Sequence, residues 1–147
     1  MGAFHQYDPG KVILSVGTLP SPISGYQEGT FIEVSRDANA FEKAVGADGE
    51  VTRIRNRNRA GSIKITLQQG SNANALLSAL ADTDELTGLG VIPLTLMDMS
   101  GAAPKSVAAT PYAWIRKKPN MTFSGNKEEA REWIFDCGTL EHFIGGN

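Results

Sequence analysis

The residues whose types and spacing are best suited to chemistry are four arginines. Arg53, Arg55, Arg57 and Arg59 occupy alternate positions in the first half of residues 50–69 (EVTRIRNRNRAGSIKITLQQ). Alternate side chains of an extended strand point to the same face, so we expect the four guanidinium groups to share one face of a strand. A guanidinium binds carboxylates and phosphates through a planar fork of N–H groups. The spacing therefore indicates ionic recognition.

Three interpretations of this arginine stripe stay open. The stripe contacts phosphates, as in grooves that bind single-stranded nucleic acid, although it lacks the interleaved aromatic residues of such grooves. Alternatively, it pairs with carboxylates of the same chain or of a neighbouring subunit. In the third interpretation it is a solvated face whose charges prevent aggregation through the strand edge. The plausible carboxylate partners are Glu128, Glu129, Glu132 and Asp136.

No sequence pattern for catalysis accompanies the stripe. The chain has no GxSxG, GxGxxG, Walker or HExxH pattern. His5 and His142 lie near opposite ends of the chain and are interpreted as surface or edge residues. The single cysteine, Cys137, rules out an internal disulfide and a cysteine-based metal site, and its neighbourhood indicates a small buried hydrophobe. We therefore expect no enzyme activity, no metal and no cofactor.

The second half of the same stretch predicts a strand that faces a core. Residues 62–68 alternate polar and apolar side chains, which turns Ile63, Ile65 and Leu67 inward, and residues 60–61 form a bend before them. Residues 41–45 are either a strand or one helical turn, and residues 46–49 form a tight turn. Further strands are predicted at residues 11–16, 30–35, 91–99 (with Pro93 at an edge or bulge), 105–118 and 128–143, the last with Arg131, Trp133, Phe135 and Cys137 on one face.

One helix is predicted, over residues 72–86. Ala73, Leu76, Leu77 and Leu80 fall at the i, i+3, i+4 and i+7 spacing of a helical face, and Gly88 or Gly90 ends the helix. We expect this helix to lie across an open end or face of a sheet.

The loop at residues 17–29 holds two prolines and three glycines, so it has no regular structure. It carries Leu19, Ile23 and Tyr26, which a fully solvated loop does not need. Either the loop folds back on the chain's own core or it docks on a partner.

The composition fits one globular domain of 147 residues, with 41% hydrophobic residues and a net charge of −2. Strands precede and follow the helix instead of alternating with helices, which favours an antiparallel β-sandwich or barrel with one packed helix. The first ten residues show no basic region followed by an apolar run, so we expect no signal peptide and synthesis in a reducing cytoplasm.

Four segments resemble the tail tube proteins of contractile-tailed bacteriophages, and the resemblance runs over about residues 10–143. The segments are residues 29–37 (GTFIEVSRD), 48–53 (DGEVTR), 61–67 (GSIKITL) with Asn72 and residues 76–80, and 93–94 with Asp98.

The resemblance implies a small β-sandwich or barrel with a flanking helix. It further implies that six copies form a ring, that rings stack into a hollow tube inside a contractile sheath, and that the inner sheets join into one barrel around the lumen. Related folds occur in the tube of type VI secretion systems. The implied function is a conduit for the genome during ejection, without catalysis. The implied partners are further copies of the chain, the sheath, the baseplate, the tail terminator and DNA passing through the lumen.

We expect the arginine stripe to lie at subunit or ring contacts, because arginines lining a lumen would retard DNA through phosphate contacts. The projecting segments expected to join rings are residues 36–59, as a hairpin, and residues 17–29. The residues expected at these interfaces are Arg53, Arg55, Arg57, Arg59, Leu19, Ile23, Tyr26, Glu128, Glu129 and Glu132. Two other hypotheses are an OB-like module that binds nucleic acid and another tail or secretion-tube component, such as a terminator or a baseplate subunit.

Overall fold

The computed structural model describes residues 4–17, 19–101 and 104–146. These residues form one short 3₁₀ helix, nine strands and one α-helix. In chain order they are η1 (Pro9–Lys11), β1 (Val12–Val16), β2 (Ile32–Arg36), β3 (Phe41–Val45), β4 (Val51–Arg55), β5 (Gly61–Leu67), α1 (Ala73–Thr87), β6 (Ile92–Asp98), β7 (Val107–Lys117), β8 (Arg131–Cys137) and β9 (Glu141–Phe143).

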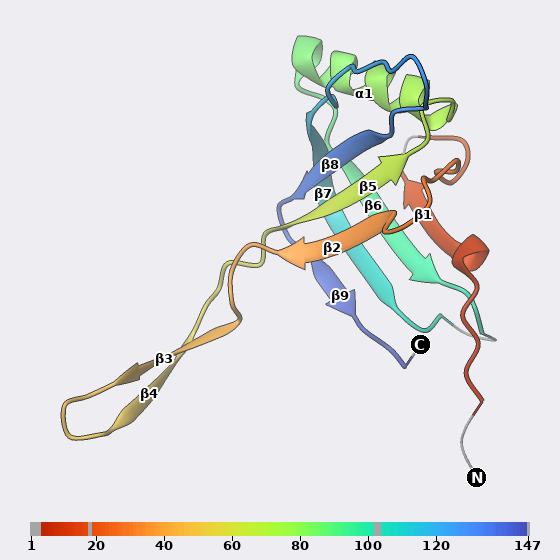
Figure 1. The fold of residues 1–147 in the computed structure, drawn as a ribbon. Helices are drawn as coiled ribbons and strands as arrows, with labels where there is room; N and C mark the ends of the chain where they lie inside the picture. The colour runs from red at the N-terminus through yellow and green to blue at the C-terminus, as the bar shows by residue number, and fades with distance from the viewer. Residues whose placement is uncertain (1–3, 18, 102–103, 147) are drawn as a thin grey trace.

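Seven strands form one curled antiparallel sheet in the order β1-β6-β7-β8-β5-β2, with β9 paired to β7 beyond the end of β8 (Figure 1). The other two, β3 and β4, form a separate two-stranded ribbon that projects from the sheet. This architecture confirms the predicted mainly β fold with one helix. The helix α1 lies across one end of the sheet (Figure 1).

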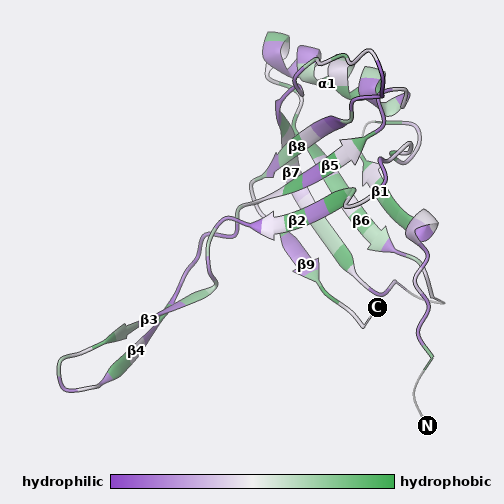
Figure 2. Ribbon diagram, in the orientation of Figure 1, coloured by the Kyte–Doolittle hydropathy of each residue, from purple (hydrophilic) through white to green (hydrophobic). Residues whose placement is uncertain are grey.

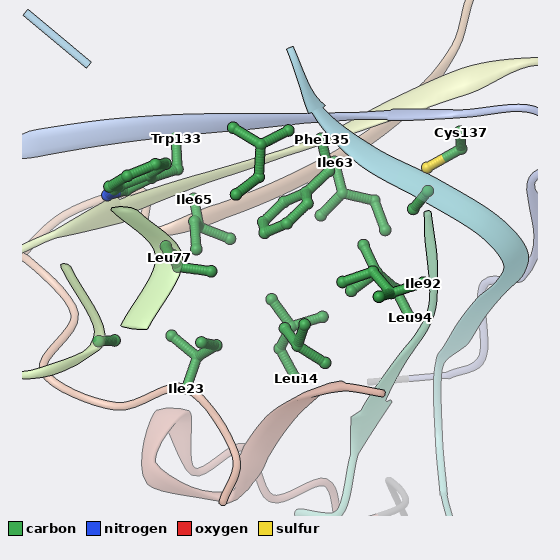
Figure 3. Close-up of a cluster of buried hydrophobic side chains, with 14 of the residues drawn as sticks. Leu14, Ile23, Ile63, Ile65, Leu77, Ile92, Leu94, Trp133, Phe135 and Cys137 are labelled. Carbon is green, nitrogen blue, oxygen red and sulfur yellow. The ribbon is translucent and has the colours of Figure 1, made fainter. Parts of the chain in front are cut away.

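The core lies inside the curl of the sheet and depends on the pairing of β5 with β8. Ile63 pairs with Phe135 and Ile65 pairs with Trp133, and all four side chains are buried and point to the same side of the sheet, into the core (Figure 3). Alternate residues along both strands are buried, as the sequence pattern predicts. Burial of side chains of this size contributes about 1.5–3 kcal/mol each to folding.

Helix α1 closes the end of the core with one narrow face. Leu77 is fully buried, whereas Leu76, predicted to share its face, is 38% exposed. The small Ala73 and Ala81 complete the buried face instead. The helix ends at Gly88, whose φ of 70° is the left-handed conformation that glycine adopts without strain. No helix in the described part of the chain is long and apolar enough to cross a membrane.

The loop at residues 17–29 folds back on the chain's own core, which confirms the first of its two interpretations. Thr18 lies outside the described residues. Ile23 is 5% exposed and belongs to the core cluster, and Leu19 and Tyr26 pack against it. The Tyr26 ring lies 4.9 Å from that of Phe31. Ile23 is therefore used within the subunit and does not project toward a partner.

The prediction that all four arginines lie on one strand is wrong. Strand β4 ends at Arg55, so Arg57 and Arg59 lie in an irregular link between β4 and β5. Two asparagine side chains cause the break, because the Asn56 Oδ1 accepts a hydrogen bond from the Asn58 N–H and the Asn58 Oδ1 accepts one from the Ala60 N–H. Such side-chain bonds compete with strand pairing.

The prediction of one continuous strand over residues 128–143 is also wrong. Strand β8 ends at Cys137 and β9 begins at Glu141. Between them the Gly138 N–H donates to the Tyr112 carbonyl and the Leu140 N–H donates to the Arg59 carbonyl. Leu140 is fully buried, so burial of this side chain accompanies the interruption.

Two local predictions are confirmed. The pairing of β6 with β7 shifts register between Ile92 and Leu94, which places Pro93 at a bulge, where a residue without an N–H is tolerated. Residues 41–45 form strand β3, not a helical turn, and pair with β4 through the turn at residues 46–49.

Two leucine variants in α1 test this packing. Leu77→Ala removes a fully buried side chain, so we expect the free energy of unfolding to fall by about 2–5 kcal/mol. Leu86→Ala, at a position that is 86% exposed, should change it by less than about 0.5 kcal/mol. Urea unfolding followed by circular dichroism measures both, and equal losses would contradict the assigned helix face.

Candidate subunit interface

The β3–β4 ribbon has no buried residue of its own. All five residues of β3 and all five of β4 are exposed. The Gly46 N–H donates to the Glu50 carbonyl to close the tip, and Gly49 has a φ of 90°. An isolated two-stranded ribbon is marginally stable in water. The ribbon therefore gains no stability from side chains buried within its own strands.

The strand register gives the ribbon two unlike faces. Directly opposed residues of an antiparallel pair share a face. On one face Phe41 opposes Arg55, Lys43 opposes Arg53 and Val45 opposes Val51. The Arg53 guanidinium lies 3.6 Å from the centroid of the Phe41 ring, a cation–π contact on this same face. We call the six residues the cationic face.

The opposite face of the ribbon is nearly uncharged. It carries Glu42 opposite Ile54 and Ala44 opposite Thr52. Along the ribbon, Figure 2 shows both hydrophobic and hydrophilic residues. The positive charge and the largest side chain therefore lie together on the cationic face.

The root of the ribbon is fixed to the sheet by Arg36. Its Nε and Nη2 donate to the Leu140 carbonyl at 3.0 and 2.8 Å. Glu141 pairs with Arg59 at 2.5 Å and with Arg36 at 3.6 Å. Neither Arg36 nor Glu141 was singled out from the sequence, because the two lie about a hundred positions apart and no local pattern links them.

Four arginines surround a hollow of about 560 Å³ at this root. Its lining consists of Arg36, Ala40, Phe41, Arg55, Asn56, Arg57 and Arg59. Within the described residues, Arg55 and Arg57 make no ion pair, so their guanidinium groups are available to a carboxylate or a phosphate from outside the chain.

The structure does not bring the predicted acidic residues to the arginines of the same chain. Each of them has another partner, and within the described residues the stripe pairs in its own chain only through Arg59, with Glu141. Glu132 pairs with Lys64 at 3.5 Å, Glu129 with Lys127 at 4.0 Å and Asp136 with Arg116 at 2.7 Å, and the Glu128 Oε1 accepts from the Gly70 N–H at 3.4 Å.

Other reactive side chains lie apart from this site. His5 and His142 are exposed, as predicted. Cys137 is buried, and burial raises the pKa of its thiol to about 11. Burial likewise raises the pKa of Tyr26. Among the described residues no group of three or more His, Cys, Asp or Glu side chains is placed to hold a metal ion.

Comparison with known proteins identifies a family. The family described as "Bacteriophage PhiTE tail tube protein" matches residues 8–145. "Structural protein ORF10" of Pseudomonas phage KPP10 is 28% identical over 152 residues, which cover 99% of this chain and 86% of that protein.

Solved structures with a similar fold come from contractile injection machines. The anti-feeding prophage cap (the tube terminating cap) has a TM-score of 0.65 at 9% identity, over 99% of this chain and 95% of that chain. The sheath/tube terminator of an extracellular contractile injection system, PVC, has a TM-score of 0.65 at 12% identity, over 97% and 100%. The PVC sheath-tube complex gives 0.59 at 13% identity, over 94% and 91%. At these identities the likeness shows a shared fold.

Removal of Arg36 tests how the ribbon is anchored. Arg36→Ala removes two hydrogen bonds to a carbonyl and one ion pair, so we expect the free energy of unfolding to fall by about 1–3 kcal/mol. Arg57→Ala is the matched control and should cost less than about 0.5 kcal/mol. Urea unfolding measures both, and an Arg36 variant as stable as the control would contradict the anchor.

Burial of Cys137 predicts a loss of stability in alkali. The folded pKa of about 11 exceeds the unfolded value of 9.0, so the unfolded chain ionises first as the pH rises. The stabilisation is complete below pH 9.0 and is lost as the pH rises through about 11. Urea unfolding from pH 8 to 11 should show a smaller decline for Cys137→Ala than for the natural chain. Parallel declines would contradict the assignment.

Proposed function

Because the chain belongs to the bacteriophage PhiTE tail tube protein family, we propose that six copies form a ring and that these rings stack into the inner tube of a contractile phage tail. The tail-tube-type structural role follows from the family, and the match over residues 8–145 carries it. The tube conducts the genome into the host during ejection. The role is structural, so no catalytic residue takes part.

The sheet supports ring formation through the outer edge of β2, which pairs with β5 alone within the described residues. The outer edge of β1 is partly covered by its own loop, because the Leu14 and Val16 carbonyls accept from the Ile23 and Leu19 N–H groups. An unpaired strand edge offers backbone N–H and carbonyl groups to a neighbour. A head-to-tail contact between this β2 edge and a different surface of the next copy generates a closed ring when the rotation closes.

The outward face of β5 and β8 suits the lining of a DNA conduit. Two carboxylates of β8 on this face neutralise neighbouring cations: Glu132 pairs with Lys64 of β5, and Asp136 pairs with Arg116 of β7. Unpaired cations would hold phosphates through counterion release. This face lines the lumen, while the arginines at the ribbon root lie at subunit contacts. DNA then passes without sequence-specific binding.

The partners follow from the assembly. The similar solved structures are described as a cap, a sheath/tube terminator and a sheath-tube complex. We accordingly assign this chain a place in the virion tail, in contact with a sheath, a terminator and a baseplate, after synthesis in the host cytoplasm.

A tail terminator is the second candidate function. The cap and the sheath/tube terminator have TM-scores of 0.65, against 0.59 for the sheath-tube complex. A terminator ends a tube with a ring and does not propagate it. Negative-stain electron microscopy of the purified protein at high concentration and several salt levels separates the two. Hollow tubes of uniform width support the tube subunit, single rings support the terminator, and a monomer that binds oligonucleotides contradicts both.

Charge reversal at the ribbon root tests the interface. Arg55→Glu/Arg57→Glu should reduce tube formation strongly, because both guanidinium groups lack an ion-pair partner within the described part of the chain. Lys11→Glu/Lys117→Glu makes the same change in net charge at exposed sites that have no ion pair within the described residues, and is the matched control. Electron microscopy and sedimentation give the tube yield. Normal tubes from the arginine variant would contradict the interface.

A further inference from the structure

The cationic face of the β3–β4 ribbon needs an acidic and apolar surface that its own chain does not supply. It combines Lys43, Arg53 and Arg55 with Phe41 and two valines, and every one of these residues is exposed. The predicted mates Glu128, Glu129 and Glu132 each have a partner in their own chain. A complementary surface is therefore one where a carboxylate without an ion pair lies beside exposed apolar side chains.

The C-terminal end of α1 has the complementary character. Asp82, Glu85 and Leu86 follow the i, i+3, i+4 spacing that places residues on one side of a helix. Leu86 on this side is 86% exposed, and Leu89, two residues beyond the last residue of α1, is 80% exposed. The end of α1 therefore carries carboxylates beside exposed apolar side chains, whereas the ribbon carries cations beside exposed apolar side chains. We call these four residues the helix end.

The helix end is also short of positive charge. The last turn of α1 contains no basic residue, although the carbonyl groups there carry the negative end of the helix dipole. Asp84 adds a third carboxylate, which accepts a hydrogen bond from the Gly90 N–H. Lys118 pairs with Asp82, and no ion pair engages Glu85 within the described residues. An arginine from another copy of the chain would offset this excess of negative charge.

The two surfaces lie at opposite ends of the subunit. Strand β5 begins at Gly61, beside the ribbon root, and ends at Leu67, from which the chain enters α1. Figure 1 shows the ribbon directed away from the helix. Complementary surfaces at opposite ends cannot meet within one chain, and between copies they make a head-to-tail contact that propagates.

We propose that the cationic face of one copy docks on the helix end of another copy in the tube. Arg53 and Arg55 meet Glu85, which has no ion pair within the described residues, and Asp82, which shares its carboxylate with the exposed Lys118. The apolar side chains of the ribbon cover Leu86 and Leu89. The inference deepens the proposed function and rests on it, since it names the surface that receives the ribbon.

Charge exchange between the two surfaces is the test. Arg53→Glu/Arg55→Glu and Asp82→Lys/Glu85→Lys each place like charges in contact, so each variant alone should lose tube yield by at least about tenfold. The chain with all four substitutions should assemble again. An equimolar mixture of the two double variants should also assemble, because each then presents a complementary surface to the other. Restoration by mixing shows that the contact joins different copies.

A second combination controls for net charge. Arg53→Glu/Arg55→Glu joined to Glu128→Lys/Glu129→Lys restores the same charge at a different acidic site and should stay defective. Circular dichroism checks that each chain is folded. Tubes from the natural chain without rescue by Asp82→Lys/Glu85→Lys overturn this inference and leave the proposed function intact. A natural chain that stays monomeric at every concentration overturns both.

Discussion

The pairing of β5 with β8 is the interaction on which the rest of the structure depends. Its seven paired positions bury Ile63, Ile65, Trp133 and Phe135 in alternation and leave the other face polar. The same strand β5 carries the ribbon at its start and α1 at its end. Because a strand of this length is rigid when paired on both sides, the core also sets the separation and direction of the two surfaces proposed to join copies.

Opposite charges gather on two separate surfaces of the subunit and are paired with each other on a third. The net charge is only −2, yet cations gather on one face of the ribbon and carboxylates at the end of α1. On the outward face of β5 and β8, by contrast, Glu132 pairs with Lys64 and Asp136 pairs with Arg116 of the neighbouring strand β7. An assembly that uses the first two surfaces as contacts leaves the third, self-neutralised surface for a channel wall.

Features that depend on the local spacing of residue types could be predicted from the sequence, whereas features that depend on contacts between distant residues could not. The inward face of β5, the bulge at Pro93 and the end of α1 at Gly88 each follow from residues close in the chain. The hydrogen bonds from the Arg36 side chain to the Leu140 carbonyl join residues 104 positions apart. For the same reason the acidic partner of Arg59 is Glu141, and alternation alone made the four arginines appear to share a strand.

Amide hydrogen exchange in the free chain and in the assembled tube tests most directly whether the ribbon is the element that joins copies. In the free chain, the amides of residues 41–55 should exchange fast because the ribbon is exposed on both faces, while those of β5 exchange slowly. Assembly should slow exchange in residues 41–55 and at the end of α1 together. Exchange in the ribbon that stays as fast in the tube as in the free chain would contradict its role as the joining element.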